Sequence, residues 1–398
     1  MAIKSDATLD KMNMLLARTV AALAVCVLVT AAVVACLWLR PAGAGRPAQE
    51  IAYVGGSDTT NLDVFLTDSS GRRTKALTTT QEDELYPAWS PDGKSLAFVR
   101  TTLAAAFGGV RPPASAGIYL LMLDGDKPRE ELLARAQDLG IGAPVWSPDG
   151  RRIAMLTVSM PPEGIGAVGS ALTIINVAAK THETIPLTPT VTGSLSALLS
   201  WSPDGTAVSF SATRGVLNLE RRGDRLPEDI PSAGYVYRFA TRTLAMVAPE
   251  ANSIAWSPTG ELLASTDTFG AKLNVVRPDG TGARTLLENA AAQDVVWSPD
   301  GKRLAASVWM GEHEGSQVLI LSIDNDSRTA LAVEGEDRGA YWLSWSRDGA
   351  YLAYTALAPS ETFPEGGLWI VDAQRGTSFA LPDPPGLETM AVWRPTSR

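Results

Sequence analysis

The sequence predicts an all-β fold: a seven-bladed β-propeller of four-stranded antiparallel blades, preceded by one N-terminal transmembrane helix. Three observations lead to this prediction. A Trp-Ser-Pro-Asp-Gly motif recurs from residue 89 onward, short β-rich segments follow each copy, and a charge-free apolar run occupies residues 20–39 of the 398. We therefore divide the chain into a short cytoplasmic N-terminus (1–19), a signal anchor (20–39), a linker (40–49) and the propeller (50–398).

The motif places one tryptophan in each repeat, and successive tryptophans lie 57, 55, 55, 41, 48 and 48 residues apart. This spacing suits four short strands with loops of variable length. In the motif, proline presets φ for a type I turn, aspartate accepts backbone hydrogen bonds, and glycine takes the left-handed conformation that follows. The tryptophans are expected to pack between blades. We assign structural roles to Trp89, Asp92, Gly93, Trp146, Asp149, Gly150, Trp201, Asp204, Gly205, Trp256, Gly260, Trp297, Asp300, Gly301, Trp345, Asp348, Gly349 and Trp393.

The two ends of the repeat region predict how the ring closes. Residues 51–54 look like the strand that follows a motif turn, and residues 391–393 look like the strand that precedes one. If these two segments pair, the C-terminal strand completes the first blade and no sheet edge stays open between the termini. Six complete copies and this shared one give seven blades.

Four copies of the pentapeptide and two variants of it (residues 256–260 and 345–349), each followed by a strand of the Leu-Ala-Phe type, make the chain from Ile51 onward resemble the WD-repeat-like propellers of the TolB family. The resemblance implies the propeller fold. Related propellers also stand beside α/β-hydrolase domains in prolyl-oligopeptidase-like enzymes, and others occur among polysaccharide lyases. The resemblance therefore leaves both binding and catalysis open.

The apolar run of residues 20–39 is long enough, as a helix, to span a bilayer core of about 30 Å. Lys4, Lys11 and Arg18 precede it, which favours a cytoplasmic N-terminus and an extracytoplasmic propeller at the cell membrane. Two alternatives stay open: a cleaved signal peptide, and a bacterial lipoprotein signal in which Cys36 would carry the lipid. Each alternative places the propeller on the far side of the membrane.

Charge and cysteine content exclude some functions of the propeller. Residues 50–398 carry 29 basic and 41 acidic residues, and this excess of negative charge disfavours nucleic-acid binding. The two cysteines, Cys26 and Cys36, both lie in the apolar run, so we expect neither a disulfide nor thiolate chemistry in the propeller.

The sequence also argues against catalysis. Residues 193–197 lack the last glycine of a nucleophile elbow. His182, in an expected turn, and His313, in an acidic loop, are too distant in sequence to suggest the histidine cluster of a metal-dependent lyase. Residues 324–326 are predicted to form a turn rather than a calcium loop. We predict no catalytic residue, metal or cofactor; the alternative is an enzyme acting on a glycan or peptide in the central channel.

Long loops are predicted on the face opposite the motif turns, at residues 102–117, 157–171, 212–234, 308–316 and 356–367. Long loops on a rigid scaffold often carry binding sites, although these could also be neutral insertions. We expect this face to bind through Glu82, Asp83 and Glu84 of an inter-blade loop, and through Arg221, Arg222 and Asp224. The predicted function is a non-catalytic binding or scaffolding propeller of a bacterial cell envelope with a protein or peptide partner. A sensor role would require a further partner within the membrane.

Overall fold

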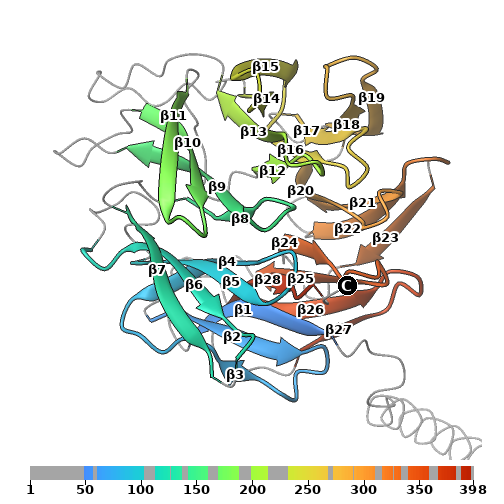
Figure 1. Ribbon diagram of the computed structural model, residues 1–398. Helices are drawn as coiled ribbons and strands as arrows, with labels where there is room; N and C mark the ends of the chain where they lie inside the picture. Colours follow the sequence, from blue (N-terminus) through green and yellow to red (C-terminus); the bar gives the residue numbers. More distant parts are fainter. Residues whose placement is uncertain are drawn as a thin grey trace, which may run out of the picture. The chain divides into compact units, whose positions relative to one another are not determined.

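In the computed structural model, 28 strands form seven four-stranded antiparallel sheets within the described part of the chain (Figure 1). The structure describes residues 49–56, 61–102, 113–125, 127–136, 142–159, 169–187, 199–213, 232–267, 272–289, 291–309, 316–325, 327–332, 339–357, 366–381 and 387–395. The innermost strands of successive sheets contact one another around a ring that closes between the last sheet and the first. The seven-bladed propeller is thereby confirmed.

We number the sheets as blades 1 to 7 and give each from its innermost strand outward. Blade 1 is β28 (Leu387–Trp393), β1 (Glu50–Gly56), β2 (Asp63–Asp68) and β3 (Lys75–Ala76); blade 2 is β4 (Asp83–Trp89), β5 (Ser95–Thr101), β6 (Gly117–Met122) and β7 (Arg129–Arg135); blade 3 is β8 (Val145–Trp146), β9 (Arg152–Ser159), β10 (Gly169–Asn176) and β11 (Thr181–Leu187); blade 4 is β12 (Ser200–Trp201), β13 (Ala207–Thr213), β14 (Ser232–Arg238) and β15 (Thr243–Ala248). Blade 5 is β16 (Ser253–Trp256), β17 (Leu263–Thr266), β18 (Lys272–Val276) and β19 (Arg284–Glu288); blade 6 is β20 (Ala291–Trp297), β21 (Arg303–Trp309), β22 (Ser316–Ser322) and β23 (Arg328–Ala332); blade 7 is β24 (Gly339–Trp345), β25 (Tyr351–Leu357), β26 (Gly366–Asp372) and β27 (Ser378–Ala380).

The repeated motif forms the turn between the first two strands of a blade. In blade 2 the Gly93 N–H donates to the Ser90 carbonyl at 2.8 Å. The Asp92 carboxylate accepts from the Lys94 N–H at 3.1 Å and from the Ser90 hydroxyl at 2.7 Å. The motif glycines take φ between 66° and 78°, a region that side chains disfavour. These bonds confirm the turn that the motif predicts.

The C-terminal strand closes the ring, as the ends of the repeat region predict. Strand β28 pairs antiparallel with β1, placing Ile51 opposite Trp393 and Ala52 opposite Val392. Beyond the strand, the Arg394 N–H donates to the Glu50 carbonyl at 2.8 Å, and the two side chains form an ion pair. The strands from the two ends of the repeat region are thus tied together, which fixes the register of the shared blade.

The motif tryptophans link each blade to the one before it. At six of the seven interfaces the indole Nε1–H donates to the carbonyl of the residue that precedes the neighbouring tryptophan, at 2.9–3.3 Å. In the seventh, Trp256 Nε1 has no partner among the described residues, although its backbone N–H donates to Ser200 Oγ at 3.1 Å. The motif tryptophans therefore lie at the interfaces between blades.

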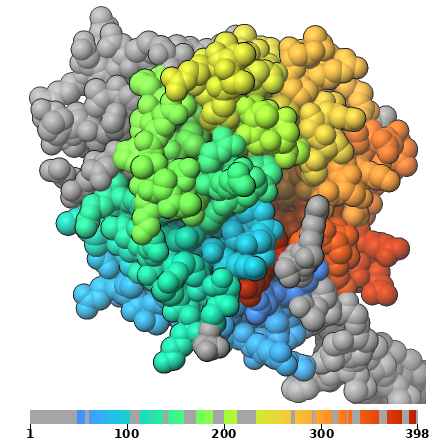
Figure 2. All heavy atoms as spheres, in the orientation of Figure 1, coloured from blue at the N-terminus to red at the C-terminus, as the bar shows by residue number. Residues whose placement is uncertain are grey.

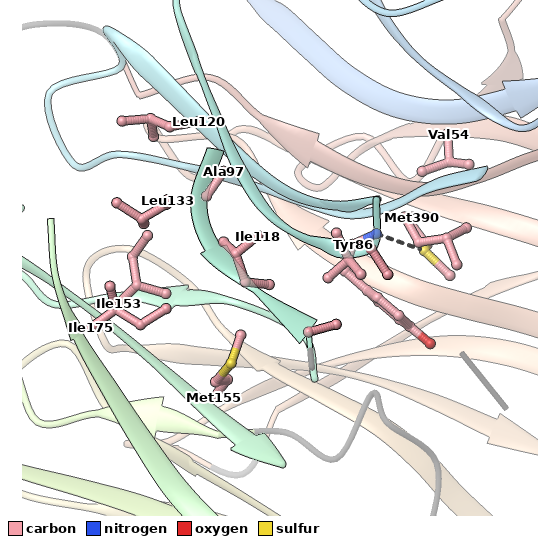
Figure 3. Close-up of a cluster of buried hydrophobic side chains, with 14 of the residues drawn as sticks. Val54, Tyr86, Ala97, Ile118, Leu120, Leu133, Ile153, Met155, Ile175 and Met390 are labelled. Carbon is pink, nitrogen blue, oxygen red and sulfur yellow. Dashed lines mark hydrogen bonds between the residues drawn. The ribbon is translucent and has the colours of Figure 1, made fainter. Parts of the chain in front are cut away.

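One hydrophobic cluster joins blades 1, 2 and 3 (Figure 3). It includes Val54, Ile118 and Met155, together with Tyr86 and Met390 from innermost strands. The Tyr86 N–H donates to the Met390 sulfur at 3.4 Å (Figure 3), and both residues take φ near 55° where their strands bulge. A positive φ is energetically unfavourable for residues other than glycine. Packing across the blade boundary compensates for this cost at Tyr86 and Met390.

Residues 1–48, with the predicted anchor and Cys36, lie outside the described residues. Across the described ranges, the structure has no helix of the length and apolarity that crossing a bilayer requires. The membrane anchor stays a prediction.

Candidate functional site

A cavity of about 1030 Å³ lies on the motif-turn face. Figure 2 shows a hollow near the middle of the molecule, where cyan, green and orange segments meet. Six blades contribute described residues to its lining: Ser90, Pro91, Asp92, Lys94, Ser95 and Leu120 of blade 2; Trp146, Pro148, Asp149, Gly150 and Val177 of blade 3; Pro203 of blade 4; Pro299 of blade 6; Trp345 and Arg347 of blade 7; and Trp393, Arg394 and Pro395 of blade 1.

The lining combines apolar rings with charges of both signs. Motif prolines from four blades and three indoles provide the apolar part. Hydrogen bonds from Ser90 and Ser147 lower the pKa values of Asp92 and Asp149, respectively, so both carboxylates are ionised at neutral pH. The exposed Lys94 adds a positive charge beside them. Ligand-binding cavities usually combine a mainly apolar lining with a few charged or polar groups that point into them.

Next to this cavity, the interface between blades 3 and 4 is clamped by an arginine. Arg152 Nη2 donates to the Gly205 carbonyl of the next motif turn at 2.8 Å. Its guanidinium lies 4.7 Å from the ring centroid of Trp201 and 5.2 Å from that of Phe239. The two rings stack on each other with centroids 5.3 Å apart. One side chain therefore joins the turn and the aromatic pair of the neighbouring blade by a charge-assisted hydrogen bond and cation–π contact.

The same arrangement, which we call the arginine clamp, occurs at two more interfaces. Arg303 of blade 6 donates to the Gly349 carbonyl at 2.7 Å and lies 4.9 Å from the Trp345 centroid. Arg394 of blade 1 donates through Nε to the Gly93 carbonyl at 2.7 Å and lies 4.8 Å from the Trp89 centroid. The clamp thus recurs with the same two partners, a motif glycine and a motif tryptophan.

The interface between blades 2 and 3 has the same backbone but different side chains. Ser95 stands where Arg152 stands one blade later, because each N–H donates to the first serine of its own motif turn at 2.9 Å. Val177 corresponds to Phe239, because each N–H donates to the residue that follows the motif glycine. Serine and valine replace arginine and phenylalanine, and both Ser95 and Val177 line the cavity.

The replacement leaves Trp146 and Gly150 accessible. Trp146 is partly exposed, whereas the other six motif tryptophans are only 6–9% exposed. Gly150 is also partly exposed, while the three clamped glycines are buried. In the described part of the chain no arginine lies over the Trp146 ring, although the Trp146 Nε1–H keeps its inter-blade bond to the Ala88 carbonyl at 2.9 Å.

The acidic residues that we expected in an inter-blade loop lie elsewhere. Asp83 and Glu84 belong to strand β4, because pairing with β5 begins at Asp83 opposite Thr101; the loop prediction was wrong there. Asp83 is buried and accepts the Leu62 N–H at 3.0 Å. Glu82 accepts from the Ser115 hydroxyl at 2.6 Å. These carboxylates hold neighbouring segments in place.

Glu84 and Arg100 are the buried members of an ion-pair network that also includes the exposed Glu130. Arg100 Nε lies 2.6 Å from Glu84 Oε1, and its Nη atoms donate to both oxygens of Glu130 at 2.7 Å. Thr80 Oγ1 donates to the same Glu84 oxygen at 2.7 Å. Burial raises the pKa of Glu84 to about 7. With none of its surface exposed, Glu84 cannot contact a partner in this conformation.

Several other predicted residues are not brought to this site. Arg221, Arg222, Asp224 and His313 lie outside the described residues, as does most of the long-loop face. His182 lies in strand β11 opposite Ile175, so the predicted turn was wrong, but the residue is exposed as expected. Throughout the described ranges, no group of three or more His, Cys, Asp or Glu side chains could hold a metal ion.

Sequence reasoning missed the group formed by Ser95, Trp146 and Val177. A signal was available, because aligning the repeats at the motif glycine places Ser95 in register with Arg152 and Arg303. The third clamp could not be found in this way, since Arg394 directly follows its own motif tryptophan. The role of the position shared by Ser95, Arg152 and Arg303 can be recognised only from the contacts between neighbouring blades.

No protein-family model matches this chain, and no curated protein matches its sequence. Solved structures do share its fold. TolB from Acinetobacter baumannii is 18% identical over 88% of this chain and 68% of that chain, with a TM-score of 0.53. An oligogalacturonate lyase from Vibrio parahaemolyticus is 14% identical over 84% and 86%, with a TM-score of 0.55. At such identities the likeness establishes the fold alone.

An acylaminoacyl peptidase from Pyrococcus horikoshii has a TM-score of 0.56 at 14% identity. The match covers 85% of this chain but only 51% of the peptidase, so this chain spans about half the length of that enzyme. The predicted likeness to TolB propellers is thus confirmed for the fold, and the same fold occurs in enzymes.

Proposed function

We propose that this protein is an extracytoplasmic binding or scaffolding propeller of a bacterial cell envelope, held at the membrane through residues 20–39. Its partner is a protein or peptide that enters the cavity on the motif-turn face. The observation that carries the proposal is the cavity of about 1030 Å³, to which six blades contribute. Binding through the long-loop face stays a prediction.

The chemistry of the lining supports a polypeptide partner. The proline rings and indole rings of the lining can pack against apolar side chains of a partner. Charges of both signs in the lining can form ion pairs with the partner. Aromatic and arginine side chains are also the residues that most often dominate binding energy at protein interfaces. The rigid ring of blades presents these groups without a folding step, which lowers the entropic cost of binding.

Site-specific photo-crosslinking in cells tests the proposal with the full chain. A photoreactive residue at Lys94, inside the cavity, is expected to give a discrete protein adduct. The same residue at Arg242, which is exposed in the turn between β14 and β15, is the control and should give none. A third position, the exposed Arg135 at the end of β7, samples the other face. Adducts from Arg135 alone would move the site to the long-loop face, and adducts from none of the three would contradict the proposal.

The alternative function is an enzyme that acts on a glycan or peptide in the channel. The fold is compatible with it, because structural neighbours include a lyase and a peptidase. The carboxylate with a pKa near 7, Glu84, would be the natural acid–base candidate, but it is fully buried and paired with Arg100. Stoichiometric metal in the purified full chain, or turnover of oligogalacturonate or peptide substrates, would favour the enzyme over the binding propeller.

A further inference from the structure

The structure points to the class of side chain that the cavity recognises. We propose that the interface between blades 2 and 3 binds an arginine side chain of the partner, whose guanidinium stacks on Trp146 and donates a hydrogen bond to the Gly150 carbonyl. This inference rests on the proposed function and makes it more specific. Its residues are Ser95, Trp146, Gly150 and Val177, all of which line the cavity.

The first argument comes from the three arginine clamps. In each, a guanidinium lies 4.7–4.9 Å from a motif tryptophan centroid and donates to the carbonyl of a motif glycine at 2.7–2.8 Å. Trp146 and Gly150 are the tryptophan and glycine of the same motif in blade 3. The turn of blade 3 has the same glycine φ and the same turn hydrogen bond as the clamped turns. We therefore take Trp146 and the Gly150 carbonyl to have the same arrangement as their counterparts in the clamps. A geometry that binds arginine three times within the chain suits an arginine from another chain.

The second argument is that this interface alone combines a motif turn without a clamp and a partly exposed tryptophan, within the described residues. The other motif tryptophans without a clamp are covered by apolar packing. Leu262 packs in the same cluster as Trp297, and Tyr351 in the same cluster as Trp393. Trp256 packs with Ala207 and Val247 and is 8% exposed. Trp146 also packs against an apolar cluster, but it alone among the seven motif tryptophans stays partly exposed, and it lines the cavity.

The third argument is charge. At two clamps a motif carboxylate of the same blade senses the arginine. The pKa of Asp149 is lowered by a hydrogen bond from Ser147 and, to a smaller extent, by the charge of Arg152. Against the effect of burial, the pKa of Asp300 is lowered by a hydrogen bond from Ser298 and, to a smaller extent, by the charge of Arg303. Asp92 has the same place at the interface between blades 2 and 3, where Ser95 brings no charge. Lys94 follows the motif glycine directly, as Arg151 and Lys302 do, and so does not replace the clamp.

Arginine fits this site better than lysine. The planar guanidinium can stack on a ring and donate in its own plane at once, whereas an ammonium group is a compact point charge. Ser95 and Val177 are each smaller than the arginine and phenylalanine that they replace, which leaves room for an incoming side chain. One cation–π contact is weak on its own, so we expect a single arginine to bind weakly and a partner to add further contacts.

Fluorine NMR of the full chain, labelled with 5-fluorotryptophan, tests the proposal with N-acetyl-arginine amide as the probe. Among the 11 tryptophans, the Trp146 resonance is identified by its loss in Trp146→Phe. We expect the probe to shift this resonance in a saturable manner and to leave the Trp201 resonance unchanged, because Arg152 already occupies that ring. The uncharged isostere N-acetyl-citrulline amide should shift it at least about tenfold less at equal concentration. Equal shifts from both probes, or none from arginine, would overturn the proposal.

Ser95→Arg supplies the decisive variant, because it places an internal arginine where the clamp predicts one. It should abolish the response of Trp146 to the probe, while Ser95→Ala should retain it. A response that survives in Ser95→Arg would contradict the site. The two proposals fail separately: adducts from Lys94 without any arginine response would refute the arginine site alone. An arginine response without adducts from Lys94 would refute the partner, since the pocket would then have no protein ligand.

Discussion

Two neighbouring blade interfaces carry different side chains at two matching positions, and only one of them has an arginine clamp. Between blades 3 and 4, Arg152 fills the space between Trp201 and Phe239 and bonds to the next turn. Between blades 2 and 3, Ser95 and Val177 stand at the matching positions, and the space belongs to the cavity. If the proposed site binds a partner, a repeat fold can turn a structural contact into a binding site through two side chains while the motif turn keeps its glycine φ and hydrogen bond.

The largest expected difference between the two interfaces lies in their tryptophans. Trp201→Ala should lower the free energy of unfolding by about 3–5 kcal/mol, since it removes a buried ring that packs against Phe239 and Arg152. Trp146→Ala should cost about 1–2 kcal/mol less, because part of that ring is already exposed. Urea denaturation of the two variants measures both losses. Equal losses would mean that Trp146 is as fully packed as Trp201.

At the end of blade 2 away from Ser95, by contrast, the charged side chains of Glu84 and Arg100 are buried and paired with each other. The pKa of Glu84 is raised from 4.5 to about 7, mainly by burial. The folded state therefore binds more protons than the unfolded state between these values, and Glu84 makes the protein less stable as the pH rises through this window. Glu84→Gln should match the wild type near pH 4.5 and exceed its stability at pH 8.

The gain at pH 8 is on the order of 1–3 kcal/mol, since one pKa unit corresponds to about 1.4 kcal/mol. Unfolding free energies at the two pH values measure it. Thr80→Val removes a hydrogen bond to the same carboxylate without removing the titrating group, and so serves as the control that retains the pH dependence. A constant difference between Glu84→Gln and the wild type across this range would show that Glu84 ionises normally.

The loss of the clamp itself has an effect of similar size. Arg152→Ala should lower the free energy of unfolding by about 1.5–3 kcal/mol, because a hydrogen bond from a charged group and a cation–π contact disappear together. Its neighbour Arg151 is exposed, and Arg151→Ala should change stability by less than about 0.5 kcal/mol. If both variants lost the same amount, general charge rather than the clamp would explain the effect.

The smallest effect is the reverse change, from an open interface to a clamped one. Ser95→Arg should raise the free energy of unfolding by about 0.5–1 kcal/mol, less than Arg152→Ala loses, because Val177 offers no second ring where Phe239 does in blade 4. Thermal unfolding of Ser95→Arg beside Ser95→Lys measures this gain. A destabilised arginine variant with a normal lysine variant would show that the space at this interface does not admit a guanidinium.

Much of the fold could be predicted from the sequence, because the motif encodes its own turn. Proline, aspartate and glycine each fix one part of the turn locally, and the pairing of β1 with β28 followed from two unmatched half-repeats. The start of β4 at Asp83 was harder to predict from the sequence. Residues 82–84 are acidic and look like a loop, whereas the bonds of Asp83 to Leu62 and of Glu84 to Arg100 make them part of a buried network.

The candidate site could be predicted only in part, since it depends on contacts between blades. The alignment of Ser95 with Arg152 is present in the sequence, but its meaning requires knowing that this side chain reaches forward to the next blade's turn. The equivalence of Val177 and Phe239 likewise comes from backbone hydrogen bonds that no local pattern reveals. Local turn chemistry is therefore readable in the residues, whereas packing between repeats is not.

A crystal structure of the full chain with N-acetyl-arginine amide tests the central claim most directly. The account predicts a guanidinium over the Trp146 ring, at the 4.7–4.9 Å from the ring centroid that the internal clamps show, with one nitrogen within hydrogen-bond distance of the Gly150 carbonyl. A guanidinium bound elsewhere in the cavity, or a Trp146 ring covered by another side chain of the protein, would contradict it.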